Sequence, residues 1–174
     1  MKFILLFTFL LPTFTYAQDF IIKEGAPYDL NESKIIFLNH EKIEVTAYKD
    51  SSKQQAYLHL RQINHNKVIK EANDKLKVAA LDYPFAYVIS SKSSFEPLVK
   101  AGYKYILDSR AYNYDNLAVQ PNEDELIVYE FFIRDLTTNL AYKVFELDEM
   151  KVYDSKLIIK RLNKKVKKVF PEAY

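Results

Sequence analysis

The chain of 174 residues contains no cysteine, which excludes a thiolate nucleophile, a cysteine-ligated zinc ion, an iron–sulfur cluster and a disulfide framework. The same absence leaves no residue for covalent lipid attachment at a secretion signal, so we do not expect a lipoprotein. Glycine occurs only at Gly25 and Gly102, which excludes glycine-rich phosphate-binding loops and the glycine-flanked serine of many hydrolases. Tryptophan is also absent, but 49% of the residues are hydrophobic and 15% are aromatic, which is typical of a compact domain.

The first 17 residues have the three parts of a secretory signal. Lys2 supplies a positive charge, Ile4–Leu11 is an almost unbroken apolar run, and Ala17 is a small residue suited to cleavage. The apolar run is shorter than the roughly 20 residues that cross a bilayer, and no later run is longer. We therefore expect a signal peptide at residues 1–17, an exported protein, periplasmic or secreted, with no transmembrane segment after cleavage, and one domain at residues 18–174. The alternative is a buried N-terminal strand or helix.

Apolar patterns along residues 34–107 predict an alternation of strands and helices. Alternating residues at 34–48 indicate a strand, bent near Asn39 and His40. Residues 53–81 contain neither glycine nor proline, and their apolar residues recur at helical spacing, which predicts one long helix. The patterns further predict a buried strand at 85–90, a short helix that starts near 93–97 and ends at Gly102, a strand at 103–107 and a long loop at 108–124.

A β-hairpin is the clearest local pattern. Apolar residues occupy every second position from Ile127 to Ile133, and the turn-forming sequence Asp135–Asn139 follows. A four-residue loop predicts that one face of the hairpin is wholly apolar and that the other carries charges. The predicted neighbours are Ile133 opposite Tyr142, Phe131 opposite Val144, and Glu130 diagonal to Lys143.

From about Asp154 the sequence predicts an amphipathic helix that covers the sheet. Its apolar stripe consists of Ile158, Ile159, Leu162, Val166 and Val169. The order strand, long helix, strand, short helix, strand, hairpin, helix predicts an α/β (α+β) fold. In that fold a mixed sheet has a long helix after its first strand, a C-terminal β-hairpin and a closing helix.

Two of these segments resemble bacterial envelope domains. The strand at Gly102–Leu107 and the turn at Asp135–Asn139 resemble those of α/β domains of the TolB N-terminal, FlgO and CsgG kind, over about residues 34–169. Asn139 stands where those domains usually have a glycine, and Asp108 or Ser109 stands where the strand often ends in another. The resemblance implies an interaction or assembly domain without catalytic residues, and it assigns no binding or catalytic site to residues of this chain.

The three histidines, His40, His59 and His65, do not form a metal-binding pattern. His59 and His65 are six residues apart on the predicted helix, whereas ligand pairs on one helical face are three or four apart. His40 could join them only through folding. Because no serine is flanked by glycine either, we expect no metal, no cofactor and no catalytic residue, and hence no enzyme.

An aromatic and acidic stretch supports an alternative function, the binding of a small ligand or glycan, or a weak hydrolase activity. Glycosidases need two carboxylates about 5–10 Å apart, and long loops on α/β scaffolds often carry function. The candidate ligand-binding residues, in or beside the loop at 108–124, are Asp108, Tyr112, Tyr114, Asp115 and Glu130. The competing interpretation is that the tyrosine rings are half-buried and that the carboxylates are solvated.

Charge is distributed unevenly along the chain. Residues 151–174 contain eight Lys or Arg and two acidic residues, whereas residues 18–150 contain 16 basic and 21 acidic residues. A basic amphipathic helix can bind an envelope protein or an anionic surface, although lysines also serve simply as a solvated face. The candidate partner-binding residues are Lys156, Lys160, Arg161, Lys164, Lys165 and Lys168. We expect no nucleic-acid partner, and our main hypothesis is an exported, non-enzymatic interaction or envelope-accessory domain.

Overall fold

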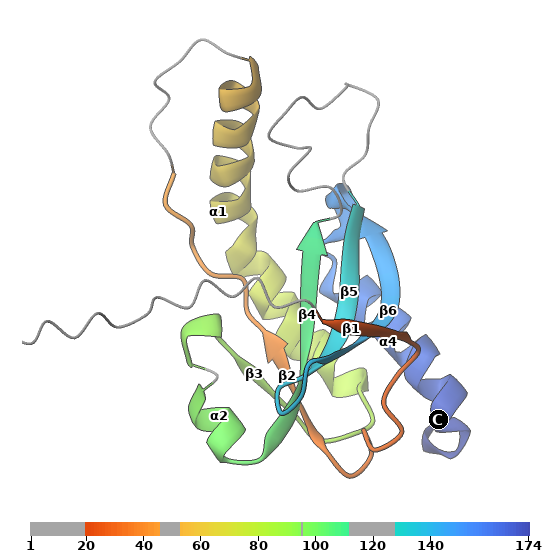
Figure 1. Ribbon diagram of the computed structural model, residues 1–174. Helices are drawn as coiled ribbons and strands as arrows, with labels where there is room; N and C mark the ends of the chain where they lie inside the picture. The colour runs from red at the N-terminus through yellow and green to blue at the C-terminus, as the bar shows by residue number, and fades with distance from the viewer. Residues whose placement is uncertain (1–19, 46–52, 95, 112–127) are drawn as a thin grey trace, which may run out of the picture.

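The computed structural model describes residues 20–45, 53–94, 96–111 and 128–174, which form a mixed sheet flanked by helices (Figure 1). The strands are β1 (Ile21–Glu24), β2 (Lys34–Leu38), β3 (Tyr87–Ser90), β4 (Tyr103–Ala111), β5 (Val128–Asp135) and β6 (Leu140–Asp148). The α-helices are α1 (Lys53–Ala79), α2 (Glu96–Lys100) and α4 (Ser155–Val169). Short 3-10 helices cover Ala80–Asp82, Lys92–Ser94, Glu149–Lys151 and Pro171–Ala173.

The sheet has six strands in the order β1-β6-β5-β4-β2-β3. β2 is parallel to both of its neighbours, β3 and β4, and β1 is parallel to β6. The pairs β4–β5 and β5–β6 are antiparallel. The predicted α/β (α+β) class with a mixed sheet is therefore confirmed, as are the long helix, the hairpin and the closing helix.

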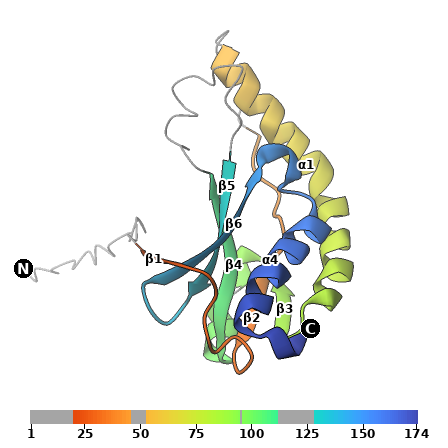
Figure 2. The ribbon, with the colours of Figure 1, turned by 90° about the vertical axis from the view of Figure 1, so that its right-hand side faces the viewer.

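The helices are divided between the two faces of the sheet. Helices α1 and α4 lie side by side on one face (Figure 2). The connections β2–α1–β3 and β3–α2–β4 cross the sheet in opposite directions, so right-handed crossovers place α1 and α2 on opposite faces. Helix α2 contacts β4, and on its face of the sheet Ile36 and Ile106 are buried.

The main core lies between the sheet and the helices α1 and α4. Leu162 and Val166 of α4 are fully buried there, and burying an aliphatic side chain of this size contributes about 1.5–3 kcal/mol. Asp154 caps α4, because its carboxylate accepts a hydrogen bond from the Leu157 N–H at 3.0 Å. The predicted apolar stripe of this helix is confirmed, with Ile158, Ile159, Leu162 and Val166 buried and Val169 half-buried.

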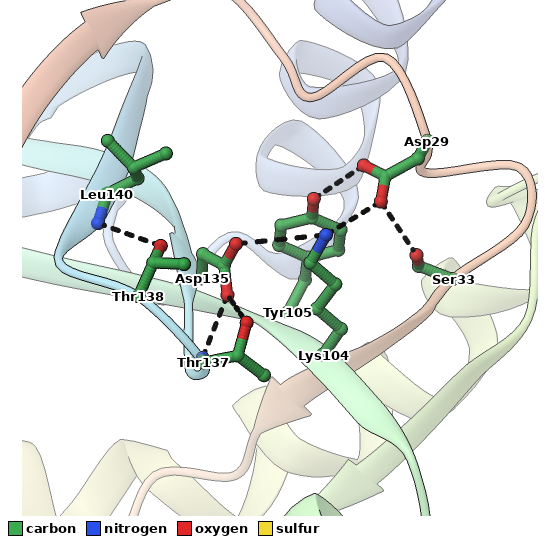
Figure 3. A network of polar contacts seen from close by, with 8 residues as sticks. All are labelled: Asp29, Ser33, Lys104, Tyr105, Asp135, Thr137, Thr138 and Leu140. Carbon is green, nitrogen blue, oxygen red and sulfur yellow. Dashed lines mark hydrogen bonds and ion pairs between the residues drawn. The ribbon is translucent and has the colours of Figure 1, made fainter.

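A polar network fixes the loop between β1 and β2 against the sheet (Figure 3). Asp29 in this loop accepts hydrogen bonds from Lys104 Nζ, at 2.8 Å, and from the Tyr105 hydroxyl. Lys104 Nζ also lies 3.8 Å from Asp135 Oδ2. The other Asp135 oxygen accepts hydrogen bonds from the N–H and hydroxyl of Thr137, so the network joins the loop, β4 and the hairpin turn.

The predicted strand at 34–48 is wrong beyond Leu38, where β2 ends. Asn73 of α1 exchanges two hydrogen bonds with the backbone of His40, of 2.8 Å to its N–H and 2.9 Å to its carbonyl oxygen. Asn66 does the same with Ile43, at 3.0 and 2.8 Å. Side-chain amides of α1 therefore replace a neighbouring strand as the partner of this segment. Residues 46–48 lie outside the described residues.

Three other boundaries differ from the sequence prediction. β3 begins at Tyr87 and is a half-buried edge strand rather than a buried one at 85–90. β4 continues to Ala111, so the loop predicted to begin at Asp108 does not begin there. β1 was not predicted; its four residues pair with the edge of the hairpin and remain exposed, so they carry no pattern of burial.

The hairpin register is partly as predicted. Ile133 lies opposite Tyr142, and Glu130 binds Lys143 across the strands at 2.7 Å. The prediction that Phe131 faces Val144 is wrong, because a register shift places Phe131 opposite Phe145. The resulting bulge leaves both Val144 and Phe145 in the core. The two phenylalanine rings stack with their centroids 4.7 Å apart.

Candidate functional site

The solvent-facing side of α4 is strongly basic. The helix contains seven basic residues and no acidic one. Six of them are exposed and Lys165 is half-buried. The basic face of α4 consists of Lys156, Lys160, Arg161, Lys164, Lys165, Lys167 and Lys168, so it contains all six candidate partner-binding residues and adds Lys167.

These cations have no acidic partners within the described residues, where no ion pair involves α4. By contrast, several basic residues elsewhere are neutralised, such as Arg61 by Glu149 at 2.6 Å and Lys143 by Glu130 at 2.7 Å. Lys167 lies over the ring of Tyr174, with 5.7 Å from Nζ to the ring centroid. The charges of α4 are thus concentrated on one side and face the solvent.

The apolar side of α4 is not available to a partner, because it is buried in the core. The helix can therefore attract an anionic surface but cannot insert apolar side chains into it. In the part of the chain that the structure describes, no helix is both long enough and apolar enough to cross a membrane.

The candidate ligand residues that the structure describes, Asp108 and Glu130, both lie on the sheet face opposite α1 and α4. Asp108 is in β4 and binds Arg134 at 3.2 Å. Glu130 in β5 is buried, and its carboxylate binds Arg110 at 3.1 Å as well as Lys143. The structure therefore brings the two carboxylates to one face but pairs each with cations.

The environment of Glu130 keeps its carboxyl ionised. Burial alone would raise its pKa, but the hydrogen bonds from Lys143 and Arg110 outweigh burial and hold the pKa below its ordinary value. A general acid in glycoside hydrolysis needs a raised pKa, so this geometry does not favour Glu130 as a proton donor. The other candidate residues, Tyr112, Tyr114 and Asp115, lie outside the described residues.

A concave region lies between the sheet and α1, where β2 and β4 end. We call it the β2–β4 crevice; its volume is about 360 Å³. His40, His65 and Tyr153 are among its lining residues, and their rings form a cluster with centroids 5.1–6.1 Å apart. Folding therefore joins His40 to His65, whereas His59 does not line the crevice.

The two histidines of the crevice differ in their bonding. His65 Nε2 donates to the Glu41 carbonyl oxygen at 2.8 Å, since that oxygen can only accept. In the neutral ring Nδ1 then accepts the proton of the Tyr153 hydroxyl, also at 2.8 Å. His40 is fixed through its backbone by Asn73, and its ring makes no hydrogen bond within the described residues. Burial, with a smaller effect of His65, lowers the pKa of His40 from 6.5 to about 4.

Metal binding has no support in this arrangement. Among the described residues no three histidine, cysteine, aspartate or glutamate side chains are grouped so that they could hold a metal ion. Both ring nitrogens of His65 already have partners.

The crevice was not predicted from the sequence. The available signal was a polar pair, Asn39 and His40, directly after a buried strand. The residues that face this pair across the crevice come from α1 and from the segment before α4, which are far away in the chain.

Comparison of the chain with family models, curated proteins and solved structures gives no match. The resemblance to the envelope domains therefore stays a prediction.

Proposed function

We propose that this protein is an exported, non-enzymatic interaction domain of the cell envelope that binds an anionic surface through the basic face of α4. The observation that carries the proposal is the set of seven cations without an ionic partner among the described residues. Near an anionic membrane surface each basic residue contributes about 1 kcal/mol.

The chemistry of α4 favours a layer of anionic headgroups over a single acidic protein. Protein interfaces depend on a few bulky anchors, often aromatic residues, that fill pockets at the centre of the contact. The solvent-facing side of α4 instead offers long lysine side chains around Arg161, while Ile158, Ile159, Leu162 and Val166 of the helix are buried. Such a surface suits attraction that is spread over many charges and weakened by salt.

Export and an envelope role are supported by the sequence of residues 1–17, with its basic start, apolar run and small residue at position 17. A non-enzymatic role is supported by the pairing of the Asp108 and Glu130 carboxylates with arginine and lysine. The envelope domains that this chain resembles are bacterial, and the membranes of a bacterial envelope carry anionic headgroups.

The test compares two variants with the same change in net charge. One reverses the charge of Lys160, Arg161, Lys164 and Lys165 to glutamate. The matched control reverses four exposed lysines away from α4, Lys23, Lys42, Lys67 and Lys70, none of which forms an ion pair among the described residues.

We expect the wild-type protein to sediment with phosphatidylglycerol vesicles but not with phosphatidylcholine vesicles. Removing four contributions of about 1 kcal/mol each predicts a partition coefficient about a thousandfold lower for the α4 variant, while the control keeps most of the binding. Equal loss in the two variants would show that net charge alone matters. Absence of wild-type binding in low salt, or capture of an acidic envelope protein in its place, would overturn the proposal.

A further inference from the structure

The β2–β4 crevice occupies the place where open α/β sheets bind ligands. β2 and β4 are adjacent and parallel, but the chain continues from β2 toward β3 on one side and from β4 toward β5 on the other. Ligands of open α/β sheets bind beyond the carboxyl ends of strands at such a switch point. Asn39 and His40 follow β2 directly, and Ser109 lies near the end of β4, so all three are located there.

The lining of the crevice combines apolar and polar side chains, as in small-molecule sites. Phe37, Leu107, Phe131 and Ile158 line its apolar part. Its polar lining includes Asn39, His40, His65 and Tyr153, together with the charged residues Glu41, Lys92 and Asp108. Its volume of about 360 Å³ is within the usual range for ligand pockets, roughly 300–1,000 Å³.

Two polar groups of the crevice lack hydrogen-bond partners within the described residues. Asn39 Oδ1 is buried and accepts no hydrogen bond, although the Asn39 backbone is fixed by a 2.8 Å bond from its N–H to the Ser90 carbonyl oxygen. The ring of His40 makes contacts with the rings of His65 and Tyr153 only through their faces and edges. Leaving buried polar groups unbonded is costly, so a molecule that forms hydrogen bonds with these atoms would gain binding free energy there.

The unpaired atoms define the chemistry of that molecule. Asn39 Oδ1 needs a donor, and a neutral His40 ring offers one donor and one acceptor. The low pKa of His40, about 4, keeps the ring neutral at physiological pH. Two acidic residues line the crevice, Glu41 and Asp108. Asp108 is already paired with Arg134 on the other face of the sheet, and the Glu41 carbonyl oxygen is bound by His65. A hydroxyl group both donates and accepts, and it requires no counter-charge.

We propose that the β2–β4 crevice binds a neutral hydroxylated ring compound, of the class of monosaccharide units, with its hydroxyl groups on Asn39 and His40 and its ring against the side chain of Tyr153. This site is separate from the basic face of α4 and does not depend on the function proposed for that face. His65 is a positioning residue, because it holds the Tyr153 hydroxyl and the Glu41 carbonyl.

The experiment is a saturation-transfer NMR titration of the protein with glucose, galactose, mannose and N-acetylglucosamine, followed by amide shift mapping. We expect at least one sugar to bind saturably and to shift amides of Asn39, His40 and Tyr153. The variants Asn39→Leu and His40→Phe should each weaken binding about tenfold or more, as expected when buried hydrogen bonds are lost. The matched controls Asn139→Leu and His59→Phe lie outside the crevice and should bind as the wild type does.

The amide spectra show whether each variant is folded, and the conservative change His40→Gln, which keeps a donor and an acceptor, should retain part of the binding. Absence of saturable binding by the folded wild type would overturn the proposal. Equal affinity of the wild type and His40→Phe would overturn it as well. Shifts at these residues with phenol but with no sugar would overturn the assigned class of ligand.

Discussion

Acidification is expected to destabilise the fold, and His40 is expected to contribute a separable part of that loss. Its imidazole is largely buried beside His65 and Tyr153, and burial lowers its pKa from 6.5 to about 4. Because the folded state holds the proton less tightly than the unfolded chain, the contribution of His40 to stability is complete above pH 6.5. It is lost as the pH falls from 6.5 toward about 4.

The magnitude follows from the two pKa values. The difference between 6.5 and about 4, at about 1.4 kcal/mol for each pH unit, gives about 3 kcal/mol in total. Between about pH 7.5 and about pH 4.5 the loss is about 2.5 kcal/mol. That is a large part of the 5–15 kcal/mol, roughly, by which domains are stable.

Urea unfolding at these two pH values measures the effect. The His40→Gln variant removes the titrating group, so its free energy of unfolding should fall with pH by about 2.5 kcal/mol less than that of the wild type. Carboxylates titrate in both proteins, and the difference between the two curves therefore isolates His40. If wild type and variant lose the same stability on acidification, the reasoning about the buried imidazole is refuted.

Three further predictions concern residues of the core and its edges. Glu130→Gln should lower the free energy of unfolding by about 1–3 kcal/mol, because Arg110 and Lys143 lose a charged acceptor; a neutral effect in urea unfolding would contradict the pairing. Asn73→Ala should accelerate hydrogen exchange of the His40 amide, because the variant removes the acceptor of that N–H. An unchanged exchange rate would contradict the hydrogen bonds between Asn73 and the His40 backbone. Leu162→Ala should cost about 2–5 kcal/mol by leaving a cavity, whereas a loss below about 1 kcal/mol in thermal unfolding would show that α4 is not packed as described.

The sequence predicts those elements whose burial repeats with a regular period. In α4 the spacing of Ile158, Leu162 and Val166 matches the buried face of a helix. In the hairpin the alternation that ends at Ile133 matches the inner face of the sheet. Both elements owe their pattern to one large apolar neighbour, so local spacing is sufficient to identify them.

The sequence does not predict features that depend on distant partners. β2 ends at Leu38 because the side-chain amides of Asn73 and Asn66 in α1 bind the backbone that follows. No local pattern in the sequence predicts these contacts. The bulge at Val144 changes the register through packing of Phe131 on Phe145. The β2–β4 crevice exists only because His40, His65 and Tyr153 come together from three separate segments.

The central claim is that the protein binds anionic surfaces through α4. Because the chain has no cysteine, a single cysteine can be introduced and labelled with a fluorophore, either at Lys168 on α4 or at Lys100 on α2, on the opposite face of the sheet. The measurement is quenching of each label by a headgroup-attached quencher in phosphatidylglycerol vesicles. The account predicts strong, salt-sensitive quenching of the label at position 168 and little quenching of the label at position 100. Equal quenching of the two labels, or stronger quenching at position 100, would contradict it.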